Sequence, residues 1–183
     1  EGELTLPTLC NQVRTLEQVV PVDYKVPGCP PNHDQVWKAI GALTAEDPPP
    51  KGSLLGVDPR TVCDQCPRER EGKIRVERFF RPHEIIPDPD RCLLEQGIIC
   101  AGPATHAGCG ALCVKAGMPC RGCYGPAEGV VDQGAKLAST IGALIDTDDP
   151  EKLQEILDTI VDPAGTFYRF GLAHSIMSKM KYE

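Results

Sequence analysis

Cysteine constrains this chain more than any other residue, because ten of its 183 residues are cysteines and four of them fall in one short stretch. That stretch is AGCGALCVKAGMPCRGC, residues 107–123, in which glycines and a proline separate the thiols. Aromatic residues make up only 5% of the chain, which also contains 18 glycines and 18 prolines. A modest core with many cysteines predicts that covalent or metal staples supply part of the stability.

Three kinds of staple use cysteines in such numbers. Disulfide frameworks are typical of short secreted chains, but the N-terminal EGELTLPTLC has neither the basic nor the apolar region of a secretory signal. Zinc would use the C-x-x-C pairs Cys63/Cys66 and Cys120/Cys123, yet the gaps between the eight later cysteines are uneven. Iron–sulfur clusters accept more scattered thiolates, and glycine and proline let the backbone fold around them. The residues therefore favour two clusters of four cysteines each, with each cluster taking a consecutive run of four.

Charge and motif content exclude several other functions. The net charge of −7 and the pI near 5.1 argue against binding to nucleic acid. No apolar run approaches the length of a membrane span. The sequence has no Walker loop, no G-x-G-x-x-G fingerprint and no nucleophile–base constellation. We therefore expect no chemistry on a bound substrate in this chain.

The first sixty residues predict one βα unit and a linker. Residues 19–26 are rich in β-branched side chains and end at Pro27-Gly28, which is typical of a strand. In PNHDQVWKAIGAL (31–43), Asn32 is placed to cap a helix with apolar residues at helical spacing. Cys29 then falls at the carboxyl end of the strand, where α/β sheets position ligand-handling residues. The proline-rich residues 45–60 read as a linker.

The rest of the chain is irregular first and helical last. Residues 61–126 show little periodicity and hold eight of the ten cysteines, so we expect bound metal to organise them. Residues 130–145 predict a helix, and a second helix is predicted after Asp149, an N-cap followed by Pro150 at the first helical position. GTFYRF is a short aromatic cluster, and residues 171–183 predict a short final helix.

Several segments resemble one known family. VPGCPPNHDQVWKAIGAL, CDQC, CLLEQGIICAGPATHAGCGALCVKAGMPCRGCYGP and DPAGTFYRF are similar to the small, electron-transferring subunit of nickel–iron hydrogenases. The closest type is the cytoplasmic methyl-viologen-reducing enzyme of methanogens. The resemblance extends from about Val19 to the end of the chain, and residues 109–126 are its most specific part.

The resemblance implies an α/β remnant of a flavodoxin-like domain, followed by a mostly irregular, helix-poor iron–sulfur domain with C-terminal helices. The boundaries would be residues 1–58 and 59–183. It implies two complete 4Fe–4S clusters and a third, proximal cluster shared through Cys29. The ligands that the resemblance implies are Cys63, Cys66, Cys92 and Cys100 for the distal cluster, and Cys109, Cys113, Cys120 and Cys123 for the medial cluster.

One departure from the family concerns the proximal cluster. Its other three ligands precede the GCPP motif in the family, whereas only Cys10 precedes Cys29 here, and PTLCNQ does not match them. We therefore expect the chain to be part of a longer subunit, or the missing half of the site to come from another polypeptide. Cys10 itself is expected to be a buried or free thiol.

The implied partners are the large subunit with its nickel–iron centre and an iron–sulfur adaptor subunit that leads to heterodisulfide reductase, all in the cytoplasm. One alternative is the small subunit of a sulfhydrogenase or an NAD(P)-linked soluble hydrogenase. An alternative of another class is an interaction module stapled by zinc, without a redox role.

Five further residues or segments allow both a structural and a functional interpretation. His106 is interpreted either as a residue that contacts the ligands without binding metal itself or as a surface residue. Lys115 and Arg121 either solvate their loop or provide a positive field that raises a cluster's reduction potential. Trp37 and residues 167–170 are interpreted as core or interface anchors.

Overall fold

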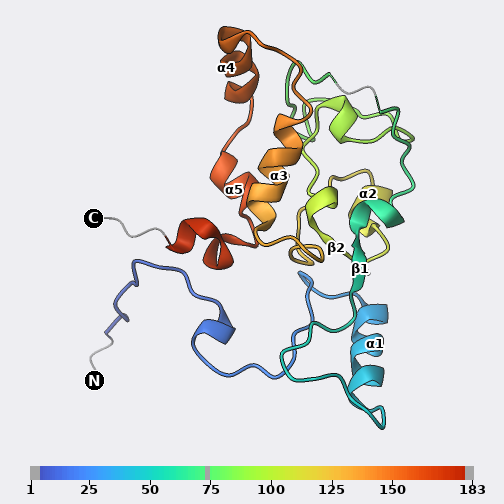
Figure 1. The fold of residues 1–183 in the computed structure, drawn as a ribbon, viewed down its shortest axis with the longest axis vertical. Coiled ribbons are helices and arrows are strands. Elements are labelled where there is room, and N and C mark those ends of the chain that lie inside the picture. The colour runs from blue at the N-terminus through green and yellow to red at the C-terminus, as the bar shows by residue number, and fades with distance from the viewer. Residues whose placement is uncertain (1–4, 73–74, 180–183) are drawn as a thin grey trace.

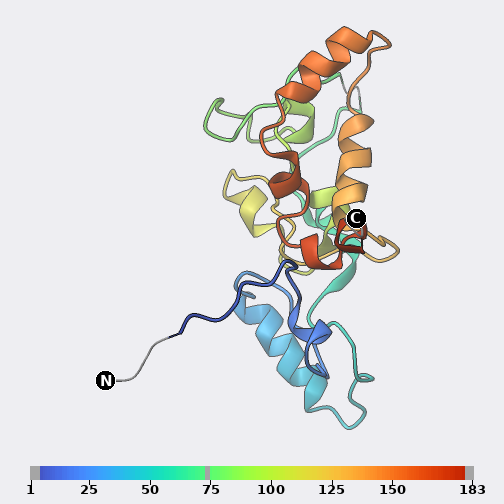
Figure 2. The same ribbon diagram turned by 90° about the vertical axis from the view of Figure 1, so that its left-hand side faces the viewer.

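A computed structural model describes residues 5–72 and 75–179 of the chain. Figures 1 and 2 show two parts: one contains the N-terminal residues and helix α1 (His33–Leu43), and the other contains the cysteine-rich segment and the C-terminal helices. Strand β1 (Asp58–Thr61) leads from the first part to the second and pairs antiparallel with β2 (His106–Ala107). The pairing is irregular between Asp58 and Thr61.

Helix α1 forms where the sequence predicts it. The Asn32 side chain accepts a hydrogen bond from the Gln35 amide at 2.8 Å and so caps the first turn. Gln35 is fully buried, and its Oε1 accepts a hydrogen bond of 2.6 Å from the hydroxyl of Tyr124 in the cysteine-rich part. Trp37, in contrast, is 70% exposed on the same helix. The helix is therefore anchored at one position and leaves apolar surface uncovered.

The predicted strand at residues 19–26 is wrong. A 3₁₀ helix at Leu16–Gln18 precedes this segment, and Lys25 forms one isolated bridge with Leu54. A strand of a parallel sheet is stabilised by neighbouring strands on which its side chains pack, and Val19 is 66% exposed here. The described residues accordingly form no clear flavodoxin-like α/β unit.

The C-terminal part contains the two predicted helices, α3 at Gln133–Gly142 and α4 at Pro150–Asp158, and also α5 at Pro163–Phe167, which was not predicted. Helix α3 begins three residues later than predicted because Asp132 accepts a hydrogen bond from the Ala135 amide at 2.8 Å. Asp149 caps α4 as predicted, through the Glu151 amide at 3.0 Å. The final segment forms 3₁₀ helices at Leu172–His174 and Ile176–Lys179, and residues 180–183 lie outside the described ranges.

Residues 61–126 are mostly irregular, as predicted. Their short elements are the 3₁₀ helices Val62–Gln65, Leu94–Gln96 and Gly102–Ala104, the four-residue helix α2 at Leu112–Lys115, and β2. The core lies between these elements and α3, and its most buried side chains include Leu93, Ile98 and Leu137. Cys100 and Cys120 are part of the same core, each 8% exposed.

Residues 17–18 contact residues 173–174. The Gln18 amide side chain donates to the Ala173 carbonyl at 3.0 Å, and Nε2 of His174 lies 2.8 Å from a Glu17 carboxylate oxygen. Glu17 also pairs with Lys25 at 2.7 Å, and this hydrogen bond lowers the pKa of its carboxyl group. Within the described ranges, the helices are too short or too polar to cross a membrane.

Candidate metal centre

Four cysteines that are far apart in the sequence line one cavity of about 280 Å³. We call it the four-cysteine cavity, and its thiols belong to Cys63, Cys66, Cys92 and Cys100. They are the four residues for which the sequence resemblance implies a common site. Val114 and Leu94 contribute apolar wall, and Arg68 and Arg70 bring positive charge to the cavity.

Local hydrogen bonds position these thiols. Asp64 accepts hydrogen bonds from the Thr61 amide and hydroxyl at 2.8 and 2.7 Å, which fixes the 3₁₀ turn that carries Cys63. The Cys92 amide donates to the Glu69 carbonyl at 2.7 Å, so the segment after Cys66 runs beside the segment before Cys92. Two short loops therefore bring three of the four thiols to the cavity without a regular sheet.

Burial dominates the acid–base behaviour of this cavity. It raises the pKa of the Cys63 thiol to about 12, although the nearby Arg70 guanidinium acts in the opposite direction. Burial also raises the pKa of Cys100, while backbone amides of Gly102 and Cys120 oppose the shift. Buried neutral thiols surrounded by hydrogen-bond donors exchange protons for metal when they bind it. Four thiols are a donor set that soft metal centres such as iron–sulfur clusters prefer.

Arg70 and Gly102 contact the thiols directly, and the sequence did not single them out. Nη2 of Arg70 donates to Sγ of Cys63 at 2.7 Å. A Cβ atom on Gly102 would lie 3.0 Å from that sulfur and 3.7 Å from Sγ of Cys100. A larger residue here would force the Cys63 sulfur or the loop to shift by a few tenths of an ångström. Arg70 stands in the charged run RERE, which looks like solvated surface, and its place four residues after Cys66 was the available signal.

The other four cysteines of residues 61–126 form a second group, Cys109, Cys113, Cys120 and Cys123. Burial raises the pKa of Cys120 to about 12, and its neighbours Cys100 and Cys109 add to the rise. The pKa of Cys123 is raised by burial first and then by Cys113 and Cys109. Each member therefore has at least one other member near enough to act on its charge.

Two glutamines hold the loops of this second group. Oε1 of Gln65 accepts hydrogen bonds from the amides of Gly108 and Gly110, at 3.0 and 2.9 Å, on either side of Cys109. Gln133 is buried at the start of α3, and its Nε2 donates to the Gly122 carbonyl at 3.0 Å. The C-x-x-C loop is thus fixed to the helix behind it.

The two groups of cysteines adjoin each other, and Cys29 lies near the second group. The Cys120 amide donates to Sγ of Cys100 at 3.2 Å, which links one group to the other. The exposed Cys29 adds to the pKa rise of Cys123, so it lies near that member of the second group.

His106, Lys115 and Arg121 do not line the four-cysteine cavity. Nδ1 of His106 is 3.1 Å from the Asp58 carbonyl oxygen, where it supports the small sheet. Lys115 and Arg121 are exposed, as is Cys10. All ten cysteines are free thiols. In residues 5–72 and 75–179, no three His, Cys, Asp or Glu side chains are arranged to hold a single metal ion.

Comparison with known proteins places the chain in a family. It is 44% identical over 178 residues to the G subunit of the vhu F420-non-reducing hydrogenase of Methanococcus voltae, covering 95% of this chain and 55% of that protein. It is 39% identical over 191 aligned positions to the iron-sulfur G subunit of the F420-non-reducing hydrogenase of Archaeoglobus profundus, covering 100% of this chain and 57% of the relative. With the G subunit of the F420-non-reducing hydrogenase of Methanothermus fervidus, it shares 45% identity over 122 residues, 62% of this chain and 93% of the relative.

Other comparisons set the limits of this relationship. No protein-family model matches the chain. The delta subunit of sulfhydrogenase 2 of Pyrococcus furiosus is more distant, with 31% identity over 107 residues, 58% of this chain and 35% of that protein. The chain spans a little over half the length of its Methanococcus and Archaeoglobus relatives. The cysteine arrangement and these identities together show that the chain belongs to the family of iron–sulfur G subunits of F420-non-reducing hydrogenases.

Proposed function

We propose that this chain relays electrons within a nickel–iron hydrogenase, as part of its small iron–sulfur subunit. The observation that supports this most strongly is the link between the two groups of four cysteines, in which the Cys120 amide donates a hydrogen bond to Sγ of Cys100 at 3.2 Å. Two neighbouring groups of cysteines in one core could hold two clusters close enough for electrons to pass between them. The iron–sulfur description of the Archaeoglobus relative agrees with this proposal.

The proposal assigns one 4Fe–4S cluster to each of the two groups of four cysteines. The four-cysteine cavity would bind one with Cys63, Cys66, Cys92 and Cys100, and Cys109, Cys113, Cys120 and Cys123 would bind the other. Cys29 would supply one ligand to a third cluster completed by residues outside this chain. When bound, such clusters supply one-electron transfer at potentials set by charge, hydrogen bonds and solvent exposure.

The chain's own residues would control these terms. Leu94 and Val114 exclude water from the four-cysteine cavity, which shares its thiols with the hydrophobic core. Arg70 donates to the Cys63 sulfur and favours its thiolate form. Gly102 leaves the space that two sulfurs occupy. Residues from four separate segments thereby control the space, the water content and the charge around the thiols.

We propose the domain division at residues 1–58 and 59–183, with the first part belonging to a flavodoxin-like domain completed by further residues. Apolar side chains without cover in this part support the idea, among them Trp37 at 70% and Val19 at 66% exposure. Both are the kind of residue that a sheet or a neighbouring helix would cover. The greater length of the relatives is consistent with such a segment.

The proposed partners are the large subunit with the nickel–iron centre, an iron–sulfur adaptor subunit and, through it, heterodisulfide reductase, in the cytoplasm. The relatives are named as subunits of a hydrogenase, which supports a large-subunit partner. The second candidate is the small subunit of a sulfhydrogenase, which the Pyrococcus relative favours over part of the chain. Copurification of the native complex distinguishes the two by the acceptor protein that it contains.

The experiment that tests the proposal is a count of iron and acid-labile sulfide per chain in the anaerobically purified complex, corrected for clusters in the other subunits. About eight irons with matching sulfide indicate two 4Fe–4S clusters, and about twelve add the shared proximal cluster. Zinc without sulfide would contradict the proposal and support a zinc-stapled interaction module instead.

A further inference from the structure

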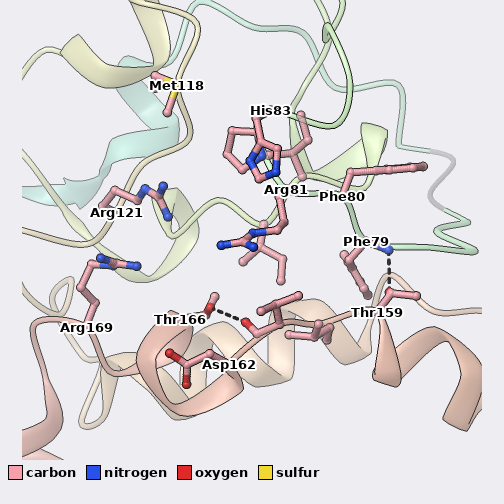
Figure 3. A pocket seen from close by; sticks show the side chains of 15 residues that line it. Phe79, Phe80, Arg81, His83, Met118, Arg121, Thr159, Asp162, Thr166 and Arg169 are labelled. Atoms are coloured by element: carbon pink, nitrogen blue, oxygen red, sulfur yellow. Dashed lines mark hydrogen bonds between the residues drawn. The ribbon is translucent and has the colours of Figure 1, made fainter.

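A second cavity, of about 370 Å³, shares no lining residue with the four-cysteine cavity. We call it the arginine cavity because Arg81, Arg121 and Arg169 line it. Figure 3 shows these three side chains, which come from separate segments, reaching into the same space. Ile98 and Ile160 are buried and belong to the apolar wall.

The charges in the arginine cavity are not balanced. Asp162 is the only carboxylate among the lining residues, and its Oδ1 already accepts a hydrogen bond from the Gly165 amide at 3.0 Å. Across residues 5–72 and 75–179, none of the three guanidinium groups has a salt bridge, and the hydrogen bonds drawn in Figure 3 do not involve them. By contrast, Arg75 pairs with Asp146 at 2.7 Å.

This gathering of positive charge contrasts with the rest of the chain, whose net charge is −7. All three arginines are exposed residues, so water screens much of the repulsion between their positive charges but does not remove it. A bound anion would remove this cost. The apolar wall would strengthen its attraction to the guanidinium groups.

We propose that the arginine cavity binds one oxyanion group, a carboxylate or a phosphate, through Arg81, Arg121 and Arg169. Planar guanidinium groups present paired donors that match the oxygens of both ligand types. The volume lies within the range of small-ligand sites. The mouth of the cavity is accessible, since Met118 and Val161 in its lining are 44% and 53% exposed. The oxyanion belongs either to a free anion or to an acidic side chain of a neighbouring polypeptide.

The arginine cavity is connected to the thiols through the chain. Arg121 lies between Cys120 and Cys123, so an oxyanion on its guanidinium group would place negative charge beside the second thiol group. The inference does not depend on the proposed function, because the charge and shape of the cavity are independent of what the cysteines bind.

The first arm of the test measures binding of inorganic phosphate to the purified complex by calorimetry. We expect saturable binding of one phosphate per chain, weakened about tenfold or more in Arg81→Gln and in Arg169→Gln, because each removes a charge-assisted hydrogen bond. Arg75→Gln is the matched control, since this exposed arginine has its own carboxylate partner. Iron and sulfide content is measured on every variant, so loss of clusters is recognised separately.

The second arm tests whether a neighbouring polypeptide supplies the oxyanion. In that case phosphate does not bind the wild-type complex, and Arg81→Gln and Arg169→Gln weaken subunit association in a salt-dependent way while Arg75→Gln does not. A photoreactive residue at Val161 would then cross-link to an Asp- or Glu-containing segment of the partner. The proposal is overturned if phosphate fails to bind and both variants assemble normally, or if Arg75→Gln has the same effect as they do.

Discussion

The backbone amide of Cys120 donates a hydrogen bond to Sγ of Cys100, across 3.2 Å and twenty positions of sequence. Cys100 lines the four-cysteine cavity, whereas Cys120 opens the C-x-x-C pair of the second group. The two thiol groups are therefore in direct contact through one donor and one acceptor. A change at either residue is expected to affect both groups.

Removal of one buried thiol should remove one cluster. We expect Cys120→Ala to lower the iron content by about four atoms per chain, because its ligand set would be incomplete. Iron and sulfide analysis with electron paramagnetic resonance spectroscopy measures this loss. Cys10→Ala is the control, since Cys10 is exposed and lies outside both groups. Unchanged spectra in Cys120→Ala would rule out Cys120 as a ligand.

Arg70 should raise the reduction potential of the group that contains Cys63. We expect Arg70→Gln to lower that potential by tens of millivolts, because about 59 mV corresponds to 1.4 kcal/mol in a one-electron couple and the positive donor at 2.7 Å is lost. A potentiometric titration followed by electron paramagnetic resonance gives the value. Arg60→Gln is the control, since Arg60 pairs with Asp58 at 2.6 Å. An equal shift in both variants would contradict a local role.

Gly102 should be needed for cluster insertion. We expect Gly102→Ala to reduce the iron content, because the new Cβ would lie 3.0 Å from Sγ of Cys63 and tighten the space around two sulfurs. Gly142→Ala is the matched control, since Gly142 ends α3 with no atom within 4 Å of a Cβ at that position. Iron analysis compares the two, and full occupancy in Gly102→Ala would show that the loop yields easily.

Gln133 should stabilise the loop of the second group. We expect Gln133→Leu to cost about 1–3 kcal/mol, because it leaves the buried Gly122 carbonyl without its donor. For a chain of this size that corresponds to a fall of several degrees in Tm. Thermal unfolding of the complex, followed by visible absorbance, measures the change. Gln154→Leu, at an exposed position of α4, should leave Tm nearly unchanged.

Local signals in the sequence predicted the helices well. Asn32 and Asp149 cap α1 and α4 because each side chain bonds an amide two or three residues away, which neighbouring residues alone can specify. The strand at residues 19–26 failed because a strand depends on partners that adjacent residues do not define. The sheet that forms instead pairs Asp58 with Ala107, residues with no shared pattern.

The sequence predicted which cysteines form the candidate site but not which other side chains contact them. Cysteine spacing and the family resemblance placed Cys63, Cys66, Cys92 and Cys100 in one site, and the structure brings these four to one cavity. The contacts of Arg70 and Gln133 arise from folding over distances that the sequence pattern does not encode. Each looks like an ordinary polar residue of a loop or helix.

Cys100 and Cys120 occupy places in the core that leucine or valine would fill in another protein. Under the proposed ligand assignment, this core is complete only when the cell's iron–sulfur assembly machinery has delivered the clusters. Maturation and folding are then the same event for residues 61–126. Under iron starvation, we expect this polypeptide to be cleared by proteases, so its abundance in the cell would follow the iron supply.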